Sequence, residues 1–193
     1  MEDLIINSLK EHYAVAERFV NDPATARNIE KAARLIASSI KAGGKVITCG
    51  NGGSLCDATH FAEELTGRFR DSRAPLPAMA INDPAHITCT TNDYSFEKIF
   101  SRVVEALGRP GDVLCGFSTS GTSKNVVEAA RAAREKGMKV VGFTRAGENP
   151  LAALSDAVIA VDHGGYSDRI QEMHITAVHI IIEGVERLVK DCL

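Results

Sequence analysis

The sequence lacks long hydrophobic runs. No stretch approaches the roughly 18 consecutive apolar residues of a membrane helix, and the N-terminus, MEDLIINSLKEHY, is acidic and amphipathic, unlike a signal peptide. We therefore expect a cytoplasmic protein with no membrane partner.

Basic blocks and closely spaced cysteines are missing as well. The 22 Lys and Arg residues against 25 Asp and Glu residues give a formal net charge of −3, so the electrostatic footprint of a nucleic-acid-binding protein is absent. The cysteines are odd in number and show no CxxC spacing, which predicts reduced thiols. Only Cys56 lies in a glycine-rich turn, and we expect it to be a small buried side chain rather than a nucleophile. The five cysteines are Cys49, Cys56, Cys89, Cys115 and Cys192.

Repeats, linkers and low-complexity tracts do not occur in the 193 residues. Apolar residues make up 45% and charged residues 24% of the chain, as in ordinary globular proteins, which argues against disorder or a coiled coil. We expect one domain over residues 1–193, with N-terminal helices in 1–42 and an α/β core and C-terminal helix in 43–193.

Short apolar runs alternate with helical patterns after the Gly43-Gly44 pair, and this alternation predicts the fold class. Runs that are apolar throughout are typical of strands buried on both faces of a parallel sheet. The sequence predicts an α/β fold with a five-stranded, doubly wound, flavodoxin-like parallel sheet, an N-terminal helical pair and a long C-terminal helix. Strands are expected at 46–49, 78–81, 113–117, 140–143 and 157–161, and later helices at 54–67, 95–107, 122–136 and 167–189.

The terminal helices carry more apolar surface than one face of such a sheet can cover. The first helix has Ile5, Leu9 and Phe19 at helical spacing, and the last has Ile175, Val178 and others. A subunit interface would bury the surplus, so we expect a homo-oligomer.

Two turns that follow predicted strands are candidate binding sites, because ligands of open parallel sheets bind beyond the carboxyl ends of the strands. One is the glycine-rich turn 50–54, and the other is the STSGTS segment at 118–123. Hydroxyl groups and free N–H groups at a helix start suit a phosphate monoester. Capping of the helix would need only one of these hydroxyls. Neither GxGxxG nor GxxxxGK[ST] occurs, which disfavours nucleotide cofactors.

A candidate metal site begins with His60 and Glu64, which lie four residues apart on one face of a predicted helix. A plain surface pair is the alternative interpretation. The last helix adds Gln171, His174 and His179, and this mixture of imidazole, carboxylate and amide suits zinc. Gln171 and His179 are about 12 Å apart along a helix axis. On spacing alone, His174 is the easier partner of Gln171. The residues by themselves do not settle which of the two histidines binds the metal.

Several motifs together resemble one known family. The segments CGNGGS, DATHFAEELTGR, NDYSF, STSGTS and YSDRIQEMHITAVH are similar to those of the sedoheptulose-7-phosphate isomerases, also called phosphoheptose isomerases, of the sugar isomerase (SIS) domain superfamily. The resemblance implies a cytosolic, zinc-dependent homotetramer. It also implies conversion of D-sedoheptulose 7-phosphate into D-glycero-D-manno-heptose 7-phosphate, the first step of ADP-heptose synthesis for the lipopolysaccharide core.

The resemblance assigns functions to individual residues. It makes Glu64 and His179 the catalytic acid/base pair, and we expect Glu64 to take the proton from C1. It places one zinc ion per subunit on His60, Glu64, Gln171 and His179, which decides for His179 over His174. The implied substrate-binding residues are Asn51, Gly52, Gly53, Ser54, Glu64, Arg68, Asn92, Asp93, Ser118, Thr119, Ser120, Ser123, Asp168 and Gln171.

Two other functions compete with this one. A non-catalytic scaffold of the same fold could bind a protein partner, but a scaffold has no need of the complete set of metal-binding and acid/base residues. An isomerase of another phosphosugar would have the same motifs and a differently shaped pocket, which the sequence does not reveal.

Overall fold

A parallel sheet of five strands forms the centre of the computed structural model, which describes residues 1–190. The strand order is β2-β1-β3-β4-β5, and all four neighbouring pairs are parallel. This confirms the predicted fold class. The strands are β1 Val46–Gly50, β2 Ala78–Ala80, β3 Val113–Phe117, β4 Lys139–Arg145 and β5 Ala157–Val161.

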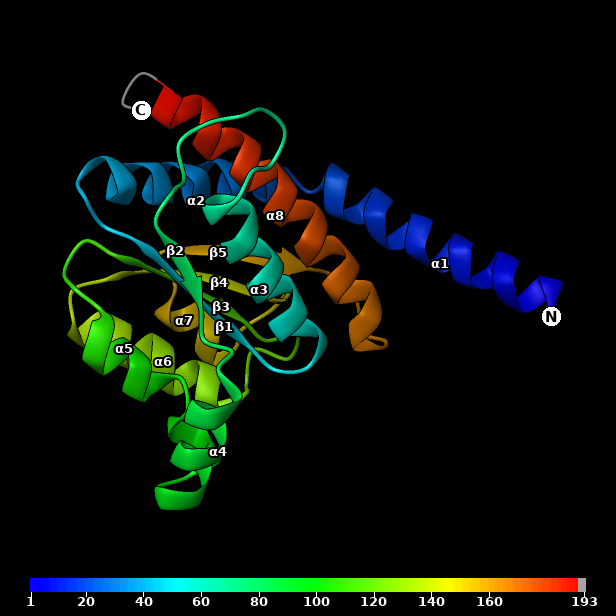
Figure 1. The fold of residues 1–193 in the computed structure, drawn as a ribbon. Coiled ribbons are helices and arrows are strands. Elements are labelled where there is room, and N and C mark those ends of the chain that lie inside the picture. Colours follow the sequence, from blue (N-terminus) through cyan, green and yellow to red (C-terminus); the bar gives the residue numbers. More distant parts are fainter. Residues whose placement is uncertain (191–193) are drawn as a thin grey trace.

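Helices cover both faces of the sheet (Figure 1). Helices α2, α3 and α8 pack on one face, and α5, α6 and α7 pack on the other. The bounds are α1 Glu2–Asn21, α2 Pro23–Lys41, α3 Gly53–Thr66, α4 Pro84–Asp93, α5 Ser101–Leu107, α6 Lys124–Glu135, α7 Pro150–Leu154 and α8 Ser167–Val189.

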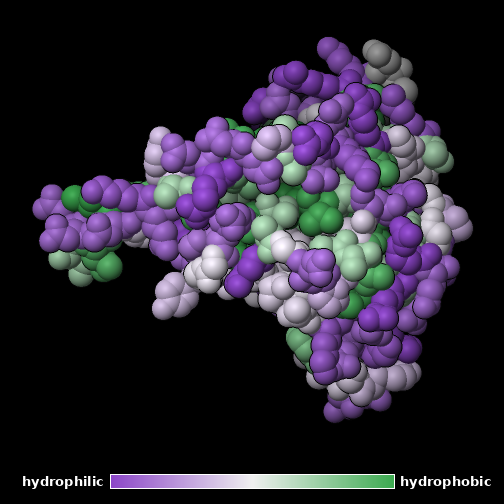
Figure 2. Space-filling model, turned by 180° about the vertical axis from the view of Figure 1, so that it is seen from behind, coloured by the Kyte–Doolittle hydropathy of each residue, from purple (hydrophilic) through white to green (hydrophobic). Residues whose placement is uncertain are grey.

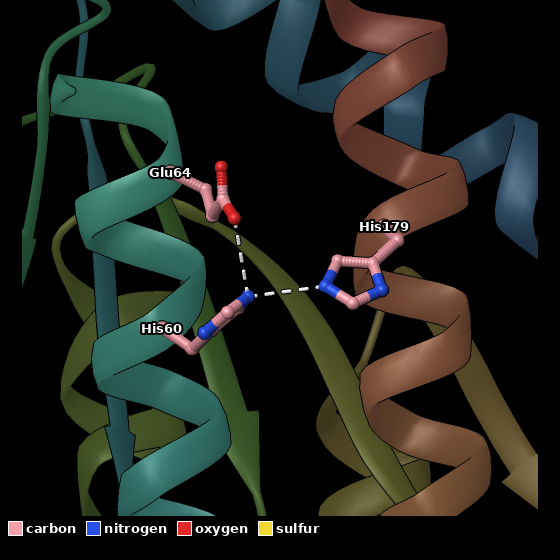
Figure 3. A group of neighbouring side chains, drawn as sticks. All are labelled: His60, Glu64 and His179. Carbon is pink, nitrogen blue, oxygen red and sulfur yellow. Dashed lines mark hydrogen bonds and ion pairs between the residues drawn. The ribbon is translucent and has the colours of Figure 1, made fainter. Parts of the chain in front are cut away.

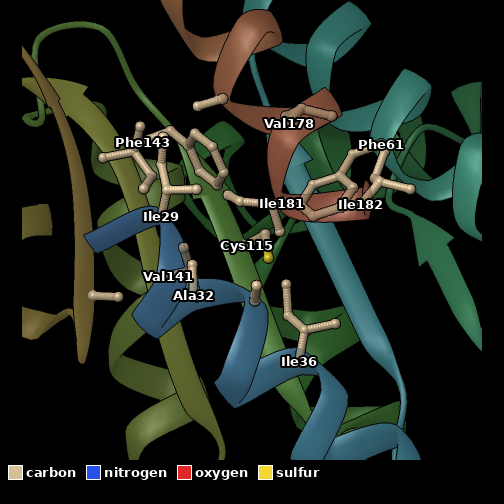
Figure 4. Close-up of a cluster of buried hydrophobic side chains, with 14 of the residues drawn as sticks. Ile29, Ala32, Ile36, Phe61, Cys115, Val141, Phe143, Val178, Ile181 and Ile182 are labelled. Atoms are coloured by element: carbon tan, nitrogen blue, oxygen red, sulfur yellow. The ribbon is translucent and has the colours of Figure 1, made fainter. Parts of the chain in front are cut away.

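The strands are buried on both faces because successive side chains point to opposite sides. In β4, Val141 and Phe143 join the hydrophobic cluster beneath α2, α3 and α8, whereas Val140 joins the cluster beneath α5 and α6. Figure 4 shows part of the first cluster, in which side chains of α2 and α8 meet those of the central strands. The uniform apolar composition of the strands thus reflects two cores, one on each side.

Helix α1 projects from the body as an arm (Figure 1). Only Val15 and Phe19 of its residues are buried. The arm ends at Asp22, whose Oδ1 accepts a hydrogen bond from the Ala24 amide at 2.8 Å, with Pro23 as the first residue of α2. An aspartate cap followed by proline starts a new helix and separates it from the preceding one.

The segment between β2 and β3 differs from the prediction. The expected helix 95–107 is wrong: a 3₁₀ turn at Phe96–Lys98 precedes a shorter α5, and α4 was not predicted. Asp83 caps α4 through the His86 amide at 2.6 Å. The ring of His86 then donates from Nε2 to the carbonyl of Ile99 at 2.8 Å. This long-range contact holds the chain just before α5, and no local pattern in the sequence reveals it.

Smaller differences concern the ends of elements. The second strand ends one residue early, β1 and β4 are longer than expected, and the short helix α7 was not predicted. Among residues 1–190, no helix is both long and apolar enough to cross a membrane.

The described cysteines carry free thiols, as predicted. Cys49 and Cys115 are buried in the sheet, and burial raises the pKa of the Cys49 thiol to about 12. Cys56 is exposed, so the prediction of a buried side chain there is wrong. It lies in the first turn of α3, beside a surface hollow that His60 also lines. Cys192 falls outside the described residues.

Candidate active site

The site lies where the strand order reverses. Strands β1 and β3 are neighbours in the sheet, but the chain leaves β1 toward α3 on one face and leaves β3 toward α6 on the other. Such a divergence opens a crevice beyond the carboxyl ends of the two strands. Both turns that the sequence singled out border this crevice.

Two asparagines bridge the two turns. Asn51 follows β1 and Asn125 lies in the first turn of α6, and their side-chain amides exchange hydrogen bonds of 2.8 and 2.9 Å. The Oδ1 atom of Asn125 also accepts from its neighbour Val126 N at 3.0 Å. Asn125 is buried and Asn51 is half-buried. This pair fixes the spacing of the turns. Asn125 was not a predicted site residue, because the hydroxyl residues before it are the feature that stands out in the sequence.

The hydroxyl groups after β3 hydrogen-bond mainly to one another. Ser118 Oγ donates to Ser123 Oγ at 2.9 Å and lies 3.4 Å from Ser120 Oγ. Thr122 donates to Ser120 Oγ at 2.9 Å. Ser123 is the residue that precedes α6, yet its side chain makes no capping hydrogen bond. The turn therefore presents a cluster of hydroxyls that helix capping does not explain.

On the other side of the crevice, His60, Glu64 and His179 converge (Figure 3). His60 Nε2 lies 3.0 Å from His179 Nε2 and 3.3 Å from Glu64 Oε1. Helix α3 supplies His60 and Glu64 one turn apart, and the neighbouring helix α8 supplies His179. Their potential ligand atoms lie within 4.8 Å of one another.

The chemistry of these three residues fits a divalent metal ion. Two ring nitrogens face each other, and the side chain of Glu64 is 16% exposed, with its Oε2 atom buried and without a hydrogen-bond partner within residues 1–190. A buried carboxylate oxygen without a partner is costly. Two imidazoles and a carboxylate are typical zinc ligands. The ring of Phe69 stacks on His179 with centroids 5.8 Å apart, which limits the positions the ring can adopt.

Gln171 and His174 take different places on α8. A Cβ atom added to Gly53 would lie 2.5 Å from Gln171 Oε1, so the Gln171 side chain packs against the first turn of α3, in the same α3–α8 seam. His174 is fully buried instead, with Nε2 donating to the Thr144 carbonyl at 3.3 Å. Burial lowers the pKa of His174 to about 4. The geometry thus separates His174 from the His60 group.

Electrostatics in the first turns of α3 are perturbed. Burial raises the pKa of the Asp57 carboxyl to about 6, and the neighbouring His60 opposes this increase. The Oδ2 atom of Asp57 is buried and has no hydrogen-bond partner in the described part of the chain. Asp57 lies one turn before His60 and was not a predicted site residue.

Other predicted site residues lie in exposed positions. Arg68 follows α3 and Asp168 lies in the first turn of α8, and both side chains face solvent. Asn92 and Asp93 lie at the end of α4, where Asn92 Nδ2 donates to Asp93 Oδ1 at 2.8 Å. Helix α4 lies below the sheet in Figure 1, and no hydrogen bond or ion pair within residues 1–190 links these four residues to the His60 group.

Comparison with known proteins identifies the family. The SIS domain family matches residues 10–145. A phosphoheptose isomerase of Pectobacterium atrosepticum is 52% identical over 190 residues, covering 98% of each chain. The chain belongs to the phosphoheptose isomerase family of SIS-domain proteins. A relative of the same name from Escherichia fergusonii is 55% identical over 186 residues, covering 96% of this chain and 97% of the relative.

Solved structures agree with this placement. A phosphoheptose isomerase from Neisseria gonorrhoeae superimposes with a TM-score of 0.89 at 36% identity, covering 96% of this chain and 98% of the other. A phosphoheptose isomerase from Francisella tularensis also superimposes with a TM-score of 0.89, at 33% identity, covering 96% of this chain and 97% of the other. Membership of the phosphoheptose isomerases makes the protein an isomerase, as the sequence motifs predicted.

Proposed function

We propose that the protein converts D-sedoheptulose 7-phosphate into D-glycero-D-manno-heptose 7-phosphate in the cytoplasm, as the first step toward ADP-heptose and the lipopolysaccharide core. The observation that carries this proposal is the position of the His60, Glu64 and His179 group beside a crevice whose opposite rim is a cluster of serine hydroxyls. An acid/base set next to an anion site suits an isomerase of phosphorylated sugars.

The phosphate group binds at the hydroxyl turn. Ser118, Thr119, Ser120 and Ser123 offer hydroxyl donors, and the start of α6 adds backbone N–H groups and the positive end of the helix dipole. Binding energy at the phosphate holds the far end of the sugar still, which orients C1 and C2 for reaction. Around C1 and C2 the contacts come from Asn51, Gly52, Gly53, Ser54, Gln171 and Asp168.

A zinc ion, one per subunit, fits His60, Glu64, Gln171 and His179. When bound there, zinc would act as a Lewis acid on the substrate oxygens. The unpaired Glu64 Oε2 and the facing nitrogens of His60 and His179 support this assignment. Gln171 joins the set by its place between α3 and α8.

Isomerisation moves a proton from C1 to C2 through an enediol, which requires a base near the carbons and an acid near the oxygens. Glu64 takes the C1 proton with its carboxylate and returns it at C2. His179, on the facing helix, gives a proton to O2 and takes one from O1, and its ring is held by Phe69. The α3–α8 seam brings both groups to the same end of the substrate.

The protein acts as a homotetramer in this proposal. Apolar side chains on α1 are exposed, and no hydrogen bond or ion pair within residues 1–190 links Asn92 and Asp93, at the end of α4, to the His60 group. In this proposal Asn92 and Asp93 contact substrate from an adjoining subunit, whereas Arg68 contacts it from the same chain, since the neighbouring Phe69 stacks on His179.

The test is an NMR assay with sedoheptulose 7-phosphate. We expect an aldoheptose phosphate to form, activity to vanish on chelation and zinc to restore it. Glu64→Gln should still bind the sugar phosphate but lose turnover by roughly 10²- to 10⁴-fold, whereas Glu63→Gln, on the exposed side of the same helix, should be near normal.

Two results would contradict the proposal. Full activity in a metal-free preparation would show that the reaction does not need zinc. Near-normal turnover of Glu64→Gln would show that Glu64 is not the base. Turnover of another phosphosugar but not of the heptulose would favour the second type of isomerase, and binding without turnover of any sugar phosphate would favour a scaffold.

A further inference from the structure

Arg145 is the last residue of β4, and the sequence motifs give it no function. It lies at the carboxyl edge of the sheet, next to the strand that leads into the hydroxyl turn. Its side chain is half-buried. A guanidinium in this position requires an explanation, because taking part of a positive charge out of water is costly unless an anion accompanies it.

The backbone of Arg145 is joined directly to the hydroxyl turn. Its amide donates to the carbonyl of Thr119 at 3.2 Å. Its carbonyl accepts from Asn149 Nδ2 at 3.3 Å. These two hydrogen bonds fix the end of β4 beside the segment proposed to hold the phosphate.

The pleat of β4 directs the Arg145 side chain toward the face that carries α8. Val141 and Phe143 point into the cluster beneath α2, α3 and α8, and Arg145 follows them at the same period of two. Thr144 points the other way, because a Cβ added to Gly121 would lie 2.6 Å from its Oγ1. Arg145 therefore lies on the same side of the sheet as the His60 group.

No carboxylate neutralises Arg145 within the described residues. None of the ion pairs in residues 1–190 includes it, and its Nε atom is buried without a hydrogen-bond partner. Other poorly exposed arginines behave differently. Arg73 pairs with Glu186 at 2.7 Å, and Arg169 pairs with Glu11 at 3.2 Å.

We propose that Arg145 is a binding residue for the phosphate of the substrate, acting from the α8 side of the crevice while the serine hydroxyls act from the α6 side. This inference rests on the proposed function, since it assumes a phosphorylated substrate at this turn. A guanidinium donates several charge-assisted hydrogen bonds to phosphate oxygens. Hydroxyl groups are neutral donors and cannot supply the positive charge.

The test compares Arg145→Gln with Arg27→Gln, which removes the same charge from an exposed position on α2. We expect Arg145→Gln to raise the KM for sedoheptulose 7-phosphate and the inhibition constant of inorganic phosphate by about tenfold or more, the loss of one charge-assisted hydrogen bond. The kcat should change much less. Arg145→Lys, which keeps the charge, should recover most of the affinity, and Arg27→Gln should match the wild type.

An independent measurement uses the wild-type protein. Titration of ¹⁵N-labelled protein with inorganic phosphate should shift the Arg145 Nε–H signal, assigned by its absence in Arg145→Lys. This readout remains valid if Arg145→Gln does not fold.

The outcomes separate this inference from the proposed function. If the wild type isomerises the heptulose phosphate while Arg145→Gln keeps its KM and its phosphate inhibition, Arg145 is not a phosphate ligand and the function stands. If the wild type does not isomerise it but phosphate still shifts the Arg145 signal, the anion site stands and the substrate assignment fails. An unchanged Arg145 signal at saturating phosphate overturns the inference directly.

Discussion

At the scale of single residues, His174 and His179 show how burial divides two similar side chains. They lie five positions apart on α8, which turns them about 140° from each other around the helix axis. His179 faces α3, whereas His174 enters the core with Phe117 and Phe143 around its ring. The sequence could not separate them, because the direction of each face depends on what α8 packs against. Only the resemblance to known enzymes favoured His179 over His174, and in the structure it is His179 that lies beside His60.

The burial of His174 has a consequence for stability. The pKa of His174 in the folded protein is about 4, against a usual value of 6.5. Between these two pH values the unfolded chain binds a proton at His174 and the folded protein does not. The free energy of unfolding therefore falls as the pH drops from 6.5 toward 4, by up to about 3 kcal/mol. Above pH 6.5 both states are neutral at this group, and it contributes no pH dependence.

We expect His174→Gln to lose this acid sensitivity. The variant will be less stable at pH 7, because glutamine fits the aromatic surroundings poorly. Between pH 7 and pH 5, however, its unfolding free energy should fall by roughly 2 kcal/mol less than that of the wild type. Urea unfolding at both pH values measures this difference, and equal losses in the two proteins would show that His174 is not neutral in the folded state.

At the scale of elements, local sequence patterns predicted those features that depend only on neighbouring residues in the chain. Five apolar runs gave the strands, because a strand covered on both faces has no polar side. The i, i+4 spacing placed His60 and Glu64 on one face of α3. Long-range contacts could not be predicted from the sequence. Two examples are the His86 hydrogen bond that shapes the chain before α5 and the pairing of Asn51 with Asn125 across 74 positions.

The seam between α3 and α8 offers a test at this scale. Gly53 begins α3, and a Cβ there would lie 2.5 Å from Gln171 Oε1. Its backbone does not require glycine, so Gly53→Ala should fold and displace the flexible Gln171 side chain instead. We expect zinc affinity to fall by roughly ten- to a hundredfold, the usual effect of disturbing the surroundings of a metal.

Gly164→Ala is the matched control, since nothing lies within 4 Å of a Cβ at that position. Competition with a chromophoric chelator would measure zinc affinity in both variants. Equal affinities would mean that Gln171 does not take part in holding the metal.

At the scale of the whole molecule, α1 is the element that the single chain explains least. Leu4, Ile5, Leu9 and Tyr13 on the arm each expose more than half of their surface. Figure 2 shows hydrophobic side chains toward the free end of the arm, between hydrophilic ones. A hollow of about 650 Å³ opens where α1 ends, between α2 and α8, with apolar walls that include Phe19, Ile29 and Leu188. Exposed apolar surface of this extent is typical of a subunit interface.

The arm therefore allows a test of the assembly. The double substitution Ile5→Glu with Leu9→Glu places two carboxylates on the apolar face and changes the net charge by about −2. Lys10→Glu changes the charge by the same amount on the polar face, where Lys10 is exposed, and serves as the control. We expect the double variant alone to shift to a smaller species in light scattering and to lose activity on dilution, because the proposed site draws residues from more than one subunit. A double variant that keeps both the wild-type mass and the wild-type specific activity at low concentration would show that α1 does not hold the assembly together, and that its apolar stripe covers some other surface.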